Sequence, residues 1–176
     1  MSRLKPAPVL ETTRLRLRQH QPANHAALHA ILSDPVTMQF WPAPFTPEQT
    51  QGWIERQVAS YAARGYGRWA VERAADGALI GDVGLALAQV NGRDEIDLGY
   101  IIHHPFWRQG YALEAARAAL EFARAQPGVT RVVANMAHDH HGSRRVAERL
   151  GMRYEGEFAN ARNRGIRTLL FAIELG

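Results

Sequence analysis

The chain has 176 residues, of which 46% are hydrophobic and none is cysteine, and its formal net charge at pH 7 is +4. These values fit one globular domain and exclude disulfides and thiolate chemistry, while the modest positive charge, spread along the chain, favours anionic partners without indicating direct nucleic-acid binding. No apolar run approaches the roughly 20 residues of a membrane span and the charged N-terminus lacks the apolar centre of a signal peptide, so we expect a cytoplasmic protein with no membrane partner.

The N-terminal region begins with an arm and a strand. Residues 1–10 are charged and interrupted by two prolines, so we expect a loose arm there. The segment Thr13–Gln19 alternates leucine with arginine, which predicts a half-buried strand. Leu15 and Leu17 would share the buried face, and the three arginines between and around them would share the opposite face.

Two helices follow the strand. The first should open at Pro22 and end at the Asp34-Pro35 pair. The second has a clear start, because Thr46 is a good N-cap, a proline follows it, and Gln49 completes a capping box. This helix should run to about Arg64, where the next residue is a glycine suited to a helix C-terminus.

The middle of the chain contains three segments typical of strands, at residues 67–74, 79–90 and 95–103. Asp76-Gly77 is a hairpin signal between the first two, and Asn91-Gly92 marks a turn before the third. Three neighbouring strands joined by short turns indicate an antiparallel arrangement.

The C-terminal half alternates helices and strands. Residues 112–125 show the amphipathic spacing of a helix, residues 129–137 form an apolar, β-branched strand, and residues 142–151 form a short helix closed by a glycine. Residues 152–161 and 166–175 read as a closing hairpin. Because antiparallel hairpins occur together with one β-α-β crossover, the sequence predicts an α/β or α+β domain built on a mixed sheet.

The loop before the helix at residues 112–125 has the features of an anion site. A helix N-terminus carries unpaired N–H groups and partial positive charge, and Gly110 removes the side chain that would keep a phosphate from the backbone. Arg108 adds a cation, whereas the charge of Glu114 would oppose a phosphate. The alternative is that Gly110 is a simple turn residue, and the residues alone leave both interpretations open.

Four segments, in order along nearly the whole chain, resemble the GNAT acyltransferases, especially the branch of ribosomal-protein N-terminal acetyltransferases. They are Leu10–Arg18, Ser33–Pro35, Asp97–Ala115 and Ser143–Glu157. The resemblance implies one domain over residues 1–176, with a mixed, mostly antiparallel, seven-stranded sheet covered by helices on both faces. It also implies that two central strands splay apart to admit acetyl-CoA as co-substrate.

The same resemblance assigns cofactor-binding positions. The family's pyrophosphate loop falls on residues 107–112, with Trp107 in place of the usual Gln or Arg, and the strand that pairs with the pantetheine arm includes Ile101 and Ile102. The family's Asn-x-x-Ser falls on His140 to Ser143, so a histidine replaces the asparagine. The loop positions expected to contact the cofactor are Trp107, Arg108, Gln109, Gly110, Tyr111 and Ala112.

Acyl transfer from a thioester to an amine requires a neutral amine, and a general acid can assist by protonating the leaving thiolate. Asp97 stands where relatives often have Glu and could act as the base, or it could be a solvated carboxylate at a strand end. Ser143 could donate to the thiolate, or it could be a helix N-cap. Many family members place a general-acid Tyr where this chain has Ala147, so Ser143, Tyr100 or water would substitute, or no acid is needed.

Two further clusters have competing interpretations. Phe40, Trp41 and Phe45 lie in a proline-rich loop and either plug the core or, together with Tyr100, wall the acceptor pocket. The histidine-rich segment His138–His141 could suggest a metal, but no second ligand group stands at matching spacing, so we expect no metal there.

The leading hypothesis is an acetyl-CoA-dependent N-acetyltransferase acting on a primary amine, either a protein N-terminus or a small amine, by direct attack. The alternative is an acyl-CoA-binding regulatory module without turnover, which the missing Asn and Tyr of the family pattern would explain. Since relatives often dimerise, a homodimer is also expected. The sequence does not identify the amine.

Overall fold

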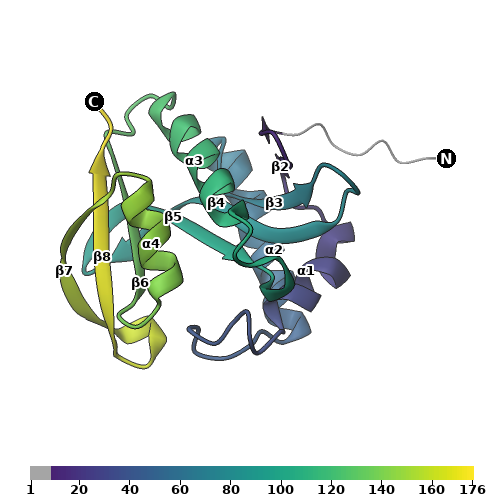
Figure 1. Ribbon diagram of the computed structural model, residues 1–176, viewed down its shortest axis with the longest axis horizontal. Helices are drawn as coiled ribbons and strands as arrows, with labels where there is room; N and C mark the ends of the chain where they lie inside the picture. The colour runs from purple at the N-terminus through teal and green to yellow at the C-terminus, as the bar shows by residue number, and fades with distance from the viewer. Residues whose placement is uncertain (1–8) are drawn as a thin grey trace.

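The computed structural model describes residues 9–176, which form an eight-stranded sheet in the order β1-β2-β3-β4-β5-β6-β8-β7 (Figure 1). Every neighbouring pair is antiparallel except β5 and β6, which are parallel. The strands are β1 (Leu10–Glu11), β2 (Leu15–Arg18), β3 (Arg68–Arg73), β4 (Leu79–Val90), β5 (Arg93–Ile102), β6 (Arg131–Ala137), β7 (Arg153–Asn160) and β8 (Ile166–Glu174).

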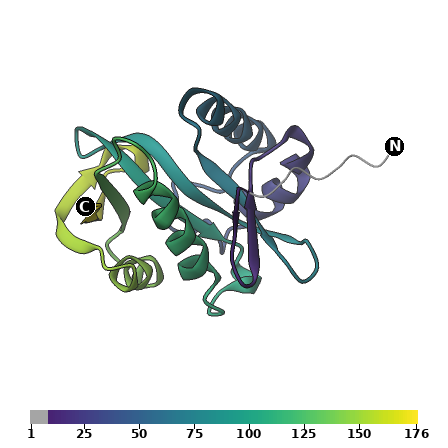
Figure 2. The same cartoon turned by 90° about the horizontal axis from the view of Figure 1, so that it is seen from above.

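Helices cover both faces of the sheet: Figure 2 shows α1 and α2 on one face and α3 and α4 on the other. The α-helices are α1 (His25–Leu32), α2 (Pro47–Arg64), α3 (Tyr111–Arg124) and α4 (His141–Arg149), and the short 3-10 helices are η1 (Pro22–Asn24), η2 (His104–Phe106) and η3 (Ala161–Asn163). The predicted mixed α/β architecture is therefore confirmed. Within residues 9–176, no helix is long and apolar enough to cross a bilayer.

The main core lies between the sheet and α3. Buried alanines on one stripe of α3, from Ala115 to Ala123, let the helix approach the sheet closely, and Trp69 fills the space beside them. A second cluster lies on the opposite face, where Leu28 and Ile31 of α1 pack with Ile54 of α2. The sheet is therefore buried on both faces at its centre, which is where the site lies.

The predicted helix boundaries are confirmed where the sequence supplies a cap. The side chain of Thr46 accepts a hydrogen bond from the backbone N–H of Gln49 at 3.2 Å, and the Gln49 side chain accepts from the Thr46 N–H at 2.8 Å. At the other end of α2, Gly65 takes the left-handed conformation with φ of 78°. The backbone needs no Cβ there, so glycine ends the helix without strain.

The N-terminal region differs from the sequence prediction in two ways. Leu10 is not part of a loose arm but belongs to β1, where it pairs with Leu17 of β2, so the sheet has eight strands instead of the seven expected. Residues 1–8 of the predicted arm lie outside the described residues. In β2, Leu15 and Leu17 are fully buried as predicted, but Arg18 is buried as well, since its guanidinium pairs with Glu72 of β3 at 2.7 Å.

The central strands β5 and β6 diverge after a single paired position, Asp97 opposite Val133 (Figure 1). On its other side β5 pairs with β4 along its whole length, and β6 pairs with β8 over Arg131–Ala137. Each strand is thus held on its outer side while the inner edge of residues 98–102 has no partner in β6. The expected splay is confirmed, and it leaves backbone N–H and C=O groups free to pair with a ligand.

Candidate active site

A cavity of ≈ 780 Å³ opens where the strands splay. Its walls come from α2, the loop before α2, strands β3 to β8, the start of α4 and the turn between β7 and β8. The sequence-predicted site residues that line it are Phe40, Trp41, Phe45, Asp97, Tyr100, Ile101, His140 and Ser143. The remaining predicted residues, Ile102 and those at 107–112, are not among the lining residues and lie at the approach to α3.

Asp97 lies at the closed end of the splay, where β5 and β6 still pair. Its Oδ1 accepts a hydrogen bond from Asn135 Nδ2 of β6 at 2.8 Å. Burial raises the pKa of the Asp97 carboxyl to about 6, although the positive charge of Arg68 and the Asn135 hydrogen bond oppose this rise. A carboxylate with this pKa is a stronger base than an ordinary surface aspartate and is still ionised at neutral pH.

Tyr100 and Ser143 form a hydroxyl pair across the splay. The Tyr100 hydroxyl donates to the Ser143 backbone carbonyl at 2.8 Å, and Ser143 Oγ lies 3.2 Å from the Tyr100 oxygen. Burial raises the pKa of Tyr100 well above its usual value, so the phenol keeps its proton at neutral pH. The interpretation of Ser143 as the N-cap of α4 is wrong, because the N-cap is His140, whose Nδ1 accepts from the Ser143 N–H.

The His140 ring bridges α4 and the aromatic loop. It stacks on Phe40 with ring centroids 3.9 Å apart and an angle of 16° between the planes. Burial lowers the pKa of His140 to about 4, so the imidazole is neutral at pH 7. Because Nδ1 accepts from the Ser143 N–H at 3.3 Å, we assign the proton to Nε2, which remains available as a donor.

The aromatic loop both packs against the core and lines the cavity, so the core-packing interpretation holds in part, and the assignment of these residues to an acceptor pocket stays a prediction. Trp41 and Phe45 of the loop pack edge to face with each other and with Trp53 of α2, and the ring centroids lie between 5.7 and 5.9 Å apart. The backbone carbonyl of Phe40 accepts from Asn163 Nδ2 at 2.7 Å, which ties the loop to the β7–β8 turn. The loop therefore spans the cavity from α2 to the far side of the splay.

The loop before α3 has the backbone of an anion cradle. Arg108 and Gly110 both take left-handed conformations, with φ of 61° and 82°, and α3 has no side-chain cap at Gly110. Alternating backbone conformations of this kind turn successive N–H groups toward one concavity. Trp107 fixes the loop to the strand end, because its Nε1 donates to the carbonyl of Ile102 at 2.5 Å.

Glu114 does not compete for this cradle. Its carboxylate turns away to Arg14, accepting from the Arg14 Nε at 2.7 Å and backbone N–H at 2.9 Å, and also from Thr12 Oγ1. Arg14 in turn lies over the ring of Tyr111, 4.4 Å from its centroid, and the Tyr111 side chain is buried. Only the backbone of Tyr111 is therefore available to a ligand at the helix start.

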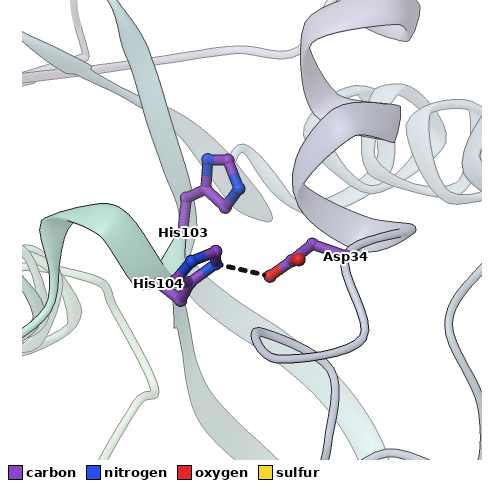
Figure 3. Close-up of side chains that lie close together, drawn as sticks. All are labelled: Asp34, His103 and His104. Carbon is purple, nitrogen blue, oxygen red and sulfur yellow. Dashed lines mark hydrogen bonds and ion pairs between the residues drawn. The ribbon is translucent and has the colours of Figure 1, made fainter.

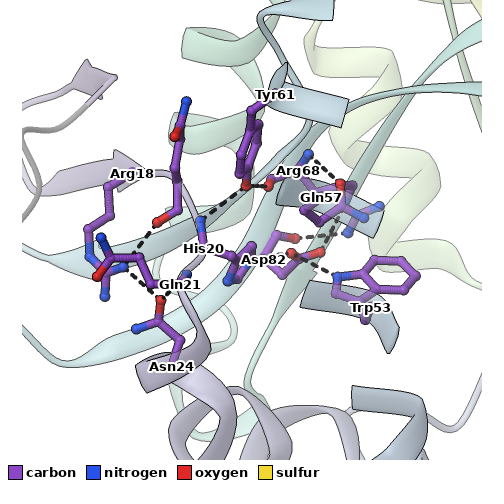
Figure 4. Close-up of polar contacts among 10 residues, drawn as sticks. Arg18, His20, Gln21, Asn24, Trp53, Gln57, Tyr61, Arg68 and Asp82 are labelled. Carbon is purple, nitrogen blue, oxygen red and sulfur yellow. Dashed lines mark hydrogen bonds and ion pairs between the residues drawn. The ribbon is translucent and has the colours of Figure 1, made fainter. Parts of the chain in front are cut away.

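A buried charged network beneath the cavity was not predicted (Figure 4). Asp82 of β4 accepts from Arg68 Nε at 2.7 Å and from Trp53 Nε1 at 3.2 Å, and lies 2.7 Å from His20 Nε2. Arg68 lies across Gly99, where a Cβ would meet its Nη1 at 1.5 Å, so glycine is required at that position. Arg68 therefore pairs with Asp82 and forms part of the cavity wall.

The sequence analysis missed two polar residues, Asp82 and Asn135, although each had a signal in the sequence. Asp82 interrupts the apolar strand Leu79–Val90, and Asn135 interrupts the apolar strand Arg131–Ala137. A polar group inside an apolar central strand must find a partner or serve a ligand, because burying it unpaired is costly. The partners, however, lie far away in sequence: Asn135 and Asp97 are 38 residues apart.

Three residues lie close enough together to hold a metal ion: Asp34, His103 and His104 (Figure 3). Asp34 Oδ2 lies 2.8 Å from His104 Nδ1 and also accepts from the N–H and hydroxyl of Thr37. These hydrogen bonds, led by that of the Thr37 hydroxyl, hold the pKa of Asp34 well below its usual value. In this arrangement the cluster joins the turn after α1 to the end of β5, and the expected absence of a metal stays a prediction.

Comparison with known proteins places this geometry in a family. The sequence profile of the "Acetyltransferase (GNAT) domain" matches residues 14–153. An uncharacterized N-acetyltransferase of Bacillus subtilis, YoaA, is 34% identical over 152 residues, which is 85% of each chain.

Solved structures share the fold. A GNAT-family acetyltransferase from Bacillus anthracis aligns with a TM-score of 0.79 at 24% identity, over 94% of this chain and 98% of that one. RimL, a ribosomal L7/L12 α-N-protein acetyltransferase in complex with coenzyme A, aligns with a TM-score of 0.74 at 20% identity, over 96% and 98% of the two chains. From its profile match, its relatives and its splayed sheet, the chain belongs to the GNAT family of acetyltransferases.

Proposed function

We propose that the protein is an acetyl-CoA-dependent N-acetyltransferase that acetylates a primary amine by direct attack. The observation that carries this proposal is the placement of Asp97, a carboxylate with a pKa of about 6, on the wall of the cavity at the point where the splay closes. An amine entering the cavity from the α2 side would meet this base, while the open edge of β5 leads from the same point toward the loop before α3.

The residues present fit the cofactor. The uncapped N-terminus of α3 and the left-handed Arg108 and Gly110 would hold its diphosphate through backbone N–H groups. The edge of β5 that has no partner in β6, which includes Ile101 and Ile102, would pair with the pantetheine arm, although the Ile102 carbonyl already accepts from Trp107 Nε1. His140 Nε2 can donate in place of the family's asparagine. Bound there, acetyl-CoA would supply the thioester carbonyl that the amine attacks.

Asp97 would remove the amine proton. With a pKa of about 6, roughly nine-tenths of the carboxylate is ionised at pH 7, so the base is in its active form at neutral pH. As the N–C bond forms and the C–S bond breaks, the amine proton passes to Asp97, directly or through water. Asn135 holds the Asp97 carboxylate in one orientation while this occurs.

The Tyr100 and Ser143 hydroxyls would protonate the leaving sulfur. Ala147, which occupies the position of the family's tyrosine, is fully buried in the main core and offers no polar group. Tyr100 reaches the same helix from β5, since its hydroxyl contacts the Ser143 carbonyl. Either hydroxyl can turn its proton toward the sulfur, and exchange with solvent then restores both groups.

Two measurements test the proposal. Acetyl-CoA at 100 times its dissociation constant should stabilise the protein by about 2.7 kcal/mol, and thiol release should exceed background with at least one primary amine. Gly110→Ala should reduce the stabilisation, because a side chain at φ of 82° strains the loop. Gly128→Ala, also at a left-handed position but with nothing near its Cβ, is the matched control and should retain it.

The results separate the two candidate functions. Stabilisation without thiol release across amines of every charge would indicate the non-catalytic acyl-CoA-binding module instead. An unchanged melting curve with acetyl-CoA would contradict both.

A further inference from the structure

The charge of the cavity wall is uneven. Arg56 and Arg64 of α2 and Arg162 of η3 line the cavity and are exposed, which places their guanidinium groups at its mouth. Arg68 lines it at depth, already paired with Asp82. Among the described residues that line the cavity, Asp97 is the sole carboxylate. The mouth is therefore cationic and the deep wall carries one basic carboxylate.

Within residues 9–176, the three arginines at the mouth take part in no salt bridge with a carboxylate. Other exposed arginines of the described residues, such as Arg93, Arg117 and Arg153, also lack a salt bridge, so what distinguishes these three is that they line one cavity. Unpaired guanidinium groups gathered at a cavity mouth are free to bind an anion from solution.

Two of these arginines share one face of α2. Arg56 and Arg64 are eight residues apart, about 12 Å along a helix, and Ser60 between them also lines the cavity. The Arg56 guanidinium lies over the ring of Trp53, 5.6 Å from its centroid, which limits its freedom. Arg162 lines the same cavity from the β7–β8 turn, and its positive charge is one of the effects that oppose the rise in the pKa of Asp97.

We propose that the acceptor is an amine that carries a carboxylate or another anionic group close to its nitrogen, bound by Arg56, Arg64 and Arg162 while the nitrogen reaches Asp97. This inference rests on the proposed acetyltransferase function and names the substrate class of the same cavity. A polyamine would be repelled by the same arginines, and a neutral amine would gain nothing from them. A free amino acid and the N-terminus of an acidic peptide share the required chemistry.

The test compares matched peptides in an assay of thiol release from acetyl-CoA. Ser-Glu-Ala, Ser-Gln-Ala and Ser-Lys-Ala, each amidated at the C-terminus, present the same amine with negative, neutral or positive charge nearby. At low ionic strength we expect kcat/KM for the acidic peptide to exceed that for the neutral one by roughly tenfold, and the ratio to shrink as salt is added. A second arm with free glutamate and free glutamine shows whether a free amino acid is the better source.

Variants assign the preference to the cavity mouth. In the triple variant Arg56→Gln, Arg64→Gln, Arg162→Gln the ratio of acidic to neutral peptide should fall to near one. Arg117→Gln removes an exposed charge from α3, outside the cavity lining, and should keep the ratio of the unaltered protein. Equal rates for the three peptides, a preference for the lysine peptide, or an unchanged ratio in the triple variant would overturn the inference while leaving the acetyltransferase function intact.

If no amine releases thiol, the proposed function fails and the charge inference is tested by binding. Thermal stabilisation by the acidic peptide should then exceed that by the neutral peptide, and the triple variant should remove the difference. Equal stabilisation by the two peptides would overturn the inference.

Discussion

Two aspartates on neighbouring strands of the same sheet have opposite properties. Asp82 of β4 is fully buried, and burial alone would raise its pKa, but the charge of Arg68 and the contacts of His20 and Trp53 outweigh burial and the pKa is lowered. Asp97 of β5 has one hydrogen-bond donor, Asn135, and its pKa rises to about 6. The number of donors around a buried carboxylate decides whether it is a fixed charge or a base.

The difference suits the two locations. Asp82 lies where β4 is paired on both sides, so its partners hold α2, β3 and β4 together beneath the cavity. Asp97 lies where the pairing of β5 ends, so fewer groups can surround it and one side faces the cavity. The splay that opens a cleft for a ligand therefore also leaves its carboxylate short of donors.

The largest expected effect comes from removing the fixed charge. Asp82→Asn removes the carboxylate that pairs with the buried Arg68 guanidinium, which should lower the free energy of unfolding by about 3–5 kcal/mol. Urea denaturation measures this loss. Asp139→Asn, at an exposed position, should change the free energy by less than about 0.5 kcal/mol, and equal effects at the two positions would contradict the structural role of Asp82.

Removing Asp97, the proposed base, should raise the free energy of unfolding rather than lower it. Because the pKa of Asp97 is raised in the folded state, its contribution to stability is complete below about pH 4 and is lost as the pH rises through about 6. Asp97→Asn should therefore raise the free energy of unfolding at pH 8 by about 1–2 kcal/mol relative to the unaltered protein, a value reduced for the partial exposure of the side chain. Denaturation at pH 4 and pH 8 checks this, and a variant that is less stable at pH 8 would contradict the raised pKa.

The donor to Asp97 can be removed separately. Asn135→Ala deletes the hydrogen bond that favours the ionised carboxylate, so the pKa of Asp97 should rise further, by up to about one pH unit. The pH of half-maximal turnover should move upward by the same amount. A shift to lower pH, or none, would show that Asn135 does not stabilise the charge of Asp97.

The smallest effect is expected at a carboxylate near the surface. Glu114 pairs with Arg14, whose side chain is 44% exposed, so Glu114→Gln should cost only about 0.2–1 kcal/mol of stability. Since Glu114 turns away from the start of α3, the variant should bind acetyl-CoA at least as tightly as the unaltered protein. Thermal shift with and without acetyl-CoA measures both quantities, and a loss of binding would contradict this geometry.

Local signals in the sequence predicted most element boundaries. The Thr46–Gln49 capping box and the glycines at 65 and 110 specify backbone conformations by themselves, and the structure has them. The two-residue strand β1 has no periodicity to detect, and Arg18 was assigned to the solvent face because its partner Glu72 is 54 residues away. The splay of the central strands was expected from the family resemblance alone, and the order of the strands was not predicted.

The family resemblance assigned Asp97, Tyr100 and Ser143 to one site, and the structure brings them to one cavity. Their roles in catalysis and binding stay predictions. Burial raises the pKa of Asp97 and the hydrogen bond from Asn135 opposes that rise, and no local pattern reveals that these two residues, 38 positions apart, come together. A cytoplasmic location, a homodimer and the absence of nucleic-acid binding stay predictions.

The most direct test of the base role is the ratio of kcat/KM for the unaltered protein to that for Asp97→Asn, measured from pH 5 to pH 9 with one amine. Because both proteins use the same amine, its own ionisation cancels in the ratio. We expect the ratio to rise about tenfold per pH unit below pH 6 and to level above it at roughly 10² to 10⁴. A ratio near one at every pH would contradict the assignment of Asp97 as the base.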